Sequence, residues 1–157
     1  MERSLKQEFT MRLSQCNKGE LVIITYDILF AYLEEAKSAY GQNNHEAYKT
    51  AIRKAQSSID TLNQSLNYQY ELSRNLHQLY VYTKNALAKA IYQNKLDSLE
   101  EAEKILKSLY ASFVEAVKTD TSGPLMSNTQ QVYAGMTYGK TSLSENFIDD
   151  SHRGFFV

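Results

Sequence analysis

Residues 20–40 read ELVIITYDILFAYLEEAKSAY, and apolar side chains recur in this stretch every three or four positions. That spacing places them on one face of an α-helix, so the stretch predicts a long helix that ends near Gly41. The stripe consists of Val22, Tyr26, Leu29, Leu33, Ala36 and Tyr40.

The other sides of this helix are also apolar in its N-terminal half. They carry Leu21, Ile23, Ile24, Ile28, Phe30 and Tyr32. A helix of a small bundle needs one apolar stripe, so a second stripe has to be covered by another part of the chain or by a partner. Leu5, Phe9 and Leu13 recur every four positions and predict a short N-terminal helix or arm that could lie there. Cover by the N-terminal helix and cover by a partner both stay open. The same surface can serve both, because apolar grooves often accept amphipathic helices.

Three further helical stripes occur along the chain. Their apolar positions are Ala47, Ala51, Ala55, Ile59, Leu62 and Leu66; then Leu72, Leu76, Leu79, Thr83, Leu87 and Ala90; then Leu99, Ala102, Leu106, Leu109, Phe113 and Ala116. Asn43 or Asn44 can cap the second long helix, and Asp97 with Glu100 predicts a capping box for the fourth. Because the connections are only a few residues long, we predict an all-α fold, an antiparallel up-down four-helix bundle with a short N-terminal helix or arm.

The composition changes after the fourth helix. Gly123-Pro124 breaks any helix, and Ser, Thr, Asn and Gly dominate the rest of the chain. We therefore predict a helical-bundle domain over residues 1–118 and an extended tail over residues 119–157. The tail still carries apolar side chains that could dock on the bundle, namely Val132, Tyr133, Met136 and Tyr138.

Charge and hydropathy restrict the function. Lys and Arg number 17 against 18 Asp and Glu, so the chain lacks the basic excess that coating nucleic acid or an acidic membrane requires. No apolar run approaches the ~20 residues that cross a bilayer, and the first residues lack the apolar stretch of a signal peptide. We expect a cytoplasmic protein without stable membrane insertion. Cys16 is the single cysteine, so the fold cannot rest on an intrachain disulfide.

The residue patterns of catalysis and of metal or cofactor binding are missing from the sequence. His45, His77 and His152 have no partners at metal-binding spacing, and no phosphate-binding loop or catalytic dyad is present. We expect no metal, no cofactor and no enzymatic activity. One alternative is a histidine phosphotransfer bundle using His77, although Gln78 and Leu79 come after it where such domains carry glycine and lysine. A non-catalytic helical adaptor is another.

Several segments together resemble the FliS family of flagellar secretion chaperones, over roughly residues 12–118. They are Glu20–Asp27 with Leu33 and Ala36; Lys54-Ala55-Gln56, Ile59-Asp60, Leu62-Asn63 and Ser65-Leu66; and Asn75-Leu76, Leu79-Tyr80, Tyr82 and Leu87. Three positions depart from the family pattern. Asn17-Lys18 replaces Ser-Pro, Ile28 replaces a frequent Gly, and Gln69-Tyr70-Glu71 replaces Gly-Gly-Glu.

The resemblance implies an antiparallel helical bundle that binds newly made flagellin in the cytoplasm. Family members hold the disordered C-terminal segment of flagellin along hydrophobic grooves, block premature polymerisation and deliver it to the type III export apparatus. An export-apparatus component or a regulatory protein is a further implied partner, and the free protein is expected as a monomer or weak homo-oligomer.

The surplus apolar surface and the resemblance together suggest client-binding residues. They are Ile24, Ile28, Leu62, Leu66, Tyr80 and Tyr82, with Asp27, Asn63 and Asn75 as polar contacts. Internal packing or capping by each of these residues stays an open alternative. Candidates for covering the empty groove are Phe9, Leu13, Val132, Tyr133, Met136 and Tyr138.

Overall fold

The computed structural model describes residues 1–119 and 123–126, and all regular structure in these residues is α-helical. The helices are α1 (Arg3–Gln15), α2 (Lys18–Gly41), α3 (His45–Gln64), α4 (Glu71–Gln93) and α5 (Asp97–Val117). This confirms the all-α prediction and the end of the first long helix at Gly41.

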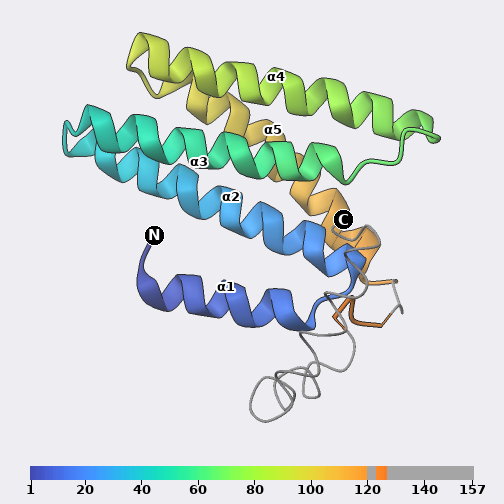
Figure 1. Ribbon diagram of the computed structural model, residues 1–157. Helices are drawn as coiled ribbons and strands as arrows, with labels where there is room; N and C mark the ends of the chain where they lie inside the picture. Colours follow the sequence, from blue (N-terminus) through green and yellow to red (C-terminus); the bar gives the residue numbers. More distant parts are fainter. Residues whose placement is uncertain (120–122, 127–157) are drawn as a thin grey trace, which may run out of the picture.

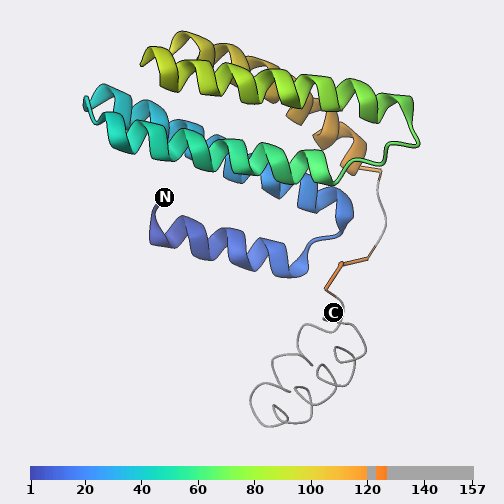
Figure 2. The ribbon, with the colours of Figure 1, turned by 45° about the horizontal axis from the view of Figure 1, so that its top comes forward.

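Helices α2 to α5 pack in a ring. Each contacts the next, α2 with α3, α3 with α4 and α4 with α5, and α5 closes the ring on α2. Figures 1 and 2 show that these four helices run alternately in opposite directions, while α1 lies on the outer side of α2. Helix α1 is therefore an addition to the ring and not one of its members.

Polar residues at the turns explain where α2 and α3 begin and where α4 ends. Asn17 Oδ1 accepts the backbone N–H of Glu20 at 2.8 Å, and the Glu20 side chain accepts the N–H of Asn17, so α2 begins in a full capping box. Asn44 caps α3 by accepting from Ala47 N–H. Asn94 ends α4 with φ 52°, a left-handed conformation that asparagine tolerates better than most residues.

The predicted cap at Asp97 is wrong. Leu96 precedes the helix with near-helical dihedrals, and its carbonyl already accepts the N–H of Glu100 at 2.9 Å. The helix therefore starts one residue earlier than the capping-box pattern requires, and no side chain caps it. Asp97 lies in the first turn, where its negative charge still favours the helix dipole.

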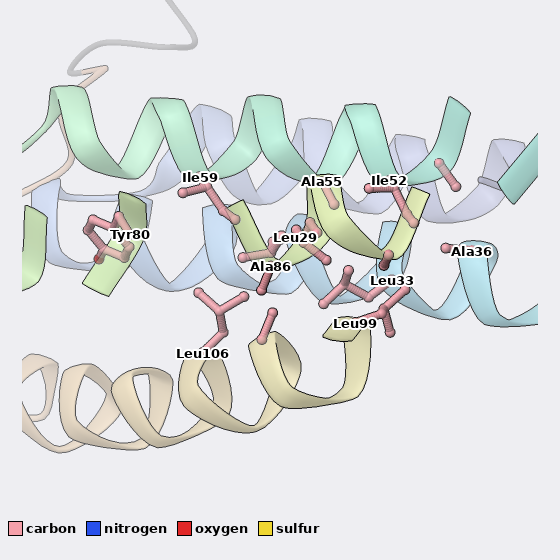
Figure 3. Packing of buried hydrophobic residues seen from close by; sticks show 14 of the residues in the cluster. Leu29, Leu33, Ala36, Ile52, Ala55, Ile59, Tyr80, Ala86, Leu99 and Leu106 are labelled. Atoms are coloured by element: carbon pink, nitrogen blue, oxygen red, sulfur yellow. The ribbon is translucent and has the colours of Figure 1, made fainter. Parts of the chain in front are cut away.

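The main core fills the ring. Its largest fully buried side chains come from all four helices and include Tyr26, Leu29 and Leu33 of α2, Tyr48 and Ile52 of α3, Tyr80 and Leu87 of α4, and Leu99 and Leu106 of α5. Figure 3 shows Leu29, Leu33, Leu99 and Leu106 converging between the helices. The Tyr26 and Tyr80 hydroxyls are 2.8 Å apart, so each polar tip is satisfied inside the core.

Candidate functional site

A second, smaller apolar cluster lies between α1 and α2, outside the main core. Phe9, Cys16 and Ile24 are its buried members. Partly buried residues packed around them are Met1, Leu5, Leu13, Leu21, Ile28 and Ala31. The second apolar face of α2 is thus covered by α1 in this structure.

Helix α1 is held lightly. Phe9 is the one residue of α1 that is buried, and Met11 is 66% exposed. Among the ring helices, α1 packs mainly against α2. Because the main core lies on the far side of α2, removing α1 would uncover the smaller cluster and leave the ring packing in place.

Ion pairs fasten α1 near both of its ends. The Met1 amino group lies 2.6 Å from Glu35 Oε2, and Arg12 Nη2 lies 2.7 Å from Asp27 Oδ2. The Arg12 guanidinium also lies over the Phe9 ring, with Cζ 5.8 Å from the centroid. Such pairs are partly exposed, so each contributes about 0.2 to 1 kcal/mol and weakens with salt.

The connection between α1 and α2 is short and extended. Cys16 ends α1 with φ −79° and ψ 150°, and Asn17 then starts α2 with its own capping box. Because that box uses only residues of α2 and its cap, α2 does not depend on α1 for its first turn. Burial raises the pKa of the Cys16 thiol, which keeps it neutral at pH 7.

Two clefts flank α1. The larger, of about 470 Å³, lies between the end of α1, the start of α2 and the end of α5. It is lined by Arg12, Gln15, Glu20, Ile23, Ile24, Val114, Val117 and Lys118. The smaller, of about 380 Å³, lies between α1, α2 and α3 and is lined by residues that include Leu13, Leu21, Ile28 and Tyr32.

The structure distributes the predicted client-binding residues over three places. Ile24, Asp27 and Ile28 lie on the face of α2 beside α1, with Ile24 buried to 3% exposure and the other two half-buried. Phe9 and Leu13, two predicted groove-covering residues, belong to the same cluster.

Other predicted residues belong to the main core. Leu62 and Tyr80 are 2% and 1% exposed, and Leu66 is half-buried against the same cluster. Burial and the neighbouring hydroxyl raise the pKa of Tyr26, and burial raises that of Tyr80, so this pair stays protonated at neutral pH. In this conformation Leu62 is closed to a partner, and Tyr80 lines, together with Asn63, a cleft of about 310 Å³ between α3 and α4.

The remaining predicted residues lie at the α3–α4 end and along α4. Asn63 Oδ1 accepts from His77 Nδ1 at 2.8 Å, and Asn75 and Tyr82 are exposed on α4. Tyr82 donates a hydrogen bond to Glu101 of α5. Val132, Tyr133, Met136 and Tyr138 lie outside the described residues.

Sequence reasoning missed the regular stripe under α1. Leu21, Ile24, Ile28, Ala31 and Glu35 succeed one another at steps of three and four; the first four belong to the cluster between α1 and α2, and Glu35 pairs with the Met1 amino group. The spacing was present in the sequence. It was hidden because the helix is apolar nearly all round in this half, so two overlapping stripes could not be separated by periodicity.

The described residues contain neither a cluster of potential metal ligands nor a helix suited to cross a membrane. No group of three or more His, Cys, Asp or Glu side chains there could hold a metal ion. Among residues 1–119 and 123–126, no helix is both long and apolar enough to cross a bilayer.

Comparison with known proteins identifies relatives of the chain. The family model described as "Flagellar protein FliS" matches residues 1–120. A protein named flagellar secretion chaperone FliS, from Bacillus subtilis (strain 168), is 26% identical over 102 residues, which covers 65% of this chain and 77% of that relative.

Proposed function

Because the chain belongs to the FliS family of flagellar proteins, we propose that it is a flagellar export chaperone whose client surface is the face of α2 beneath α1. The client is the disordered C-terminal segment of flagellin. Bound there, flagellin is kept from polymerising in the cytoplasm until the type III export apparatus receives it.

One observation carries this proposal. The apolar cluster of Phe9, Ile24 and their neighbours is separate from the main core, and a helix with one buried residue closes it. An amphipathic segment of the client can replace α1 on this face without opening the ring of α2 to α5. Helix α1 then protects the apolar face from aggregation when no client is bound.

The energetics favour a long client segment. Each apolar side chain that the client buries contributes about 1.5 to 3 kcal/mol, and ordering a disordered segment costs about 2 to 5 kcal/mol. The client also competes with α1, so only the difference between the two contacts contributes to affinity. The face beneath α1 alone leaves little surplus, and a second contact area is needed.

The outer side of α4 offers that second area. Leu72, Leu79 and Tyr82 are 66%, 36% and 49% exposed and lie at helical spacing, with Asn75 between them. This area includes two predicted client-binding residues, Asn75 and Tyr82. Apolar side chains that are exposed in a row along one helix favour a binding site there.

The same surface favours a second candidate function. A helical adaptor for a folded partner would use α4 and would leave α1 in place. The chaperone requires a disordered client and loses the contact between α1 and α2 when the client binds. The adaptor requires no disordered client and keeps that contact.

The test is a titration of the full chain with a fluorescent peptide that spans the last ~40 residues of the host's flagellin, a length suited to coupled folding. The chaperone predicts saturable one-to-one binding with a gain in helicity. Ile28→Asp should abolish binding, because a carboxylate would be buried under the client. Tyr92→Asp is the control, since Tyr92 is 90% exposed near the end of α4 and outside the stripe of Leu72, Asn75, Leu79 and Tyr82. No binding by the full chain, or equal loss in both variants, would reject the proposal.

A further inference from the structure

The smaller cleft beside α1 continues the apolar face that α1 covers. Leu21 and Ile28 of α2 belong both to the cluster beneath α1 and to the lining of this cleft. Leu13 of α1 lines it as well, and Tyr32 carries its apolar floor toward α3. The wall on α3 consists of Lys54, Ser57, Ser58 and Thr61. A client segment that replaces α1 on α2 therefore comes to lie along these side chains of α3.

The serine and threonine hydroxyls of this cleft already donate hydrogen bonds inside their own helices. Thr25 Oγ1 donates to the Leu21 carbonyl at 2.7 Å. Three hydroxyls of α3 also donate to carbonyls four residues earlier, and they belong to Ser57, Ser58 and Thr61. Their oxygens can still accept a hydrogen bond, but their protons are engaged. An acidic group of a client therefore has to be met by another side chain of the cleft.

Lys54 is the charged side chain among the described residues that line this cleft. Its Nζ lies 5.7 Å from the centroid of the Tyr32 ring, so a cation–π contact places the ammonium over the apolar floor. Lys54 is exposed, and none of the ion pairs within residues 1–119 and 123–126 includes it. Lys37 and Lys84, by contrast, are paired with carboxylates of other helices. The cleft thus presents a positive charge that has no anionic partner in the described chain.

We propose, as a consequence that rests on the proposed function, that Lys54 is a specificity-determining residue of the client surface. It pairs with a carboxylate on the polar side of an amphipathic client helix whose apolar side covers Leu21 and Ile28. A client that covers the cleft removes part of the water around the ammonium, and an unpaired charge there opposes binding. A client carboxylate compensates that charge. Lys54 therefore selects for a segment with an acidic side chain at this position and against one with lysine or arginine there.

Titration of full-chain variants with the fluorescent flagellin peptide tests this pairing. Lys54→Gln should weaken binding by about three- to fivefold at low salt, and Lys54→Arg should bind as the unaltered chain does, because it keeps the positive charge. The matched control is Arg53→Gln, which removes the same charge from the preceding position of α3. Arg53 is exposed and does not line the cleft, so this variant should keep its affinity. Unchanged affinity in Lys54→Gln would overturn the proposal, and so would equal losses in Lys54→Gln and Arg53→Gln, which indicate an effect of net charge alone.

A second series of titrations identifies the partner of Lys54 on the client. Each Asp and Glu of the peptide is replaced in turn by Asn or Gln, and its terminal carboxylate by an amide. One of these changes should weaken binding to the unaltered chain by about the same factor as Lys54→Gln does, and it should have no effect on Lys54→Gln itself, because the pair is already absent. Additive losses for every acidic group would contradict the pairing. If the unaltered chain binds no peptide, the proposed function fails and this role of Lys54 with it, whereas binding to which Lys54 contributes nothing rejects the role of Lys54 alone.

Discussion

Arg12 Nη2 donates to Asp27 Oδ2 across 2.7 Å, which joins the last turn of α1 to the face of α2 that α1 covers. Burial raises the pKa of the Tyr110 phenol of α5, and the nearby Asp27 carboxylate raises it further. The carboxylate therefore still has a phenol of α5 beside it if Arg12 withdraws. This arrangement allows the pair to break without stranding a buried charge.

Arg12→Gln should consequently increase the affinity for the flagellin peptide by about two- to fivefold at low salt, because a partly exposed ion pair that holds α1 closed is lost. The gain should shrink as salt is added, since screening already weakens the pair in the unaltered protein. Lys84→Gln, which breaks the partly exposed Lys84–Asp60 pair between α3 and α4, is the control and should change nothing. Titration at two salt concentrations measures both effects, and a loss of affinity in Arg12→Gln would contradict the role given to α1.

Phe9→Ala should show that the small cluster opens independently of the main core. Phe9 is the buried anchor of α1, so its truncation should speed amide hydrogen exchange throughout Arg3–Gln15 while α2 to α5 stay protected. Leu87→Ala, which opens a cavity in the main core, should instead lower the free energy of unfolding of the whole ring by about 2 to 5 kcal/mol. Hydrogen exchange with mass spectrometry distinguishes the two. Uniform loss of protection in Phe9→Ala would show that α1 and the ring form one cooperative unit.

Tyr80→Phe should destabilise the ring more than its small change in volume suggests. It leaves the buried Tyr26 hydroxyl without its partner at 2.8 Å, at a cost of about 1 to 3 kcal/mol. The double variant Tyr26→Phe with Tyr80→Phe should recover part of that stability, because neither buried hydroxyl remains. Urea unfolding monitored by circular dichroism measures the free energy of unfolding of the unaltered chain, of Tyr80→Phe and of the double variant. Unchanged client affinity in Tyr80→Phe would assign Tyr80 to the core, and a large loss would return it to the client surface.

The free energy of unfolding should fall at high pH because the buried Tyr48 hydroxyl ionises there. Burial raises its pKa to about 12, above the ordinary value of about 10 that it has when unfolded. A raised pKa stabilises the fold fully below pH 10, and this contribution is lost as the pH rises from 10 to 12. Tyr48→Phe removes the ionisable group together with its hydrogen bond to the Lys95 carbonyl. Its free energy of unfolding should be lower at pH 8 and should decline less above pH 10, and parallel pH profiles for the two proteins would contradict this.

The sequence predicted the helices well because their signals are local. Stripes at steps of three and four, together with Asn44 as a cap, can be recognised without knowing which helices lie next to each other. The predicted cap at Asp97 was wrong because the Leu96 carbonyl accepts the first hydrogen bond of the helix. The helix therefore begins one residue earlier, and the pattern of side chains does not indicate this backbone hydrogen bond.

The candidate site was harder to predict because it depends on which side of each helix meets another. Leu62 and Tyr80 were grouped with Ile24 and Ile28, yet the ring turns the first two inward and leaves the others under α1. Periodicity gives the faces of a helix but not the neighbour that each face receives. On α2, where both faces are apolar, only the packing assigns one to the core and the other to α1.

The client surface is tested most sharply by amide hydrogen exchange of α1 in the full chain, measured with and without saturating flagellin peptide. Because the client replaces α1 on α2, we predict faster exchange across Arg3–Gln15 and slower exchange along the covered face of α2 when the peptide is bound. If the peptide binds one-to-one and exchange in α1 stays the same or slows, the client does not use the face beneath α1, and the proposed chaperone mechanism is wrong.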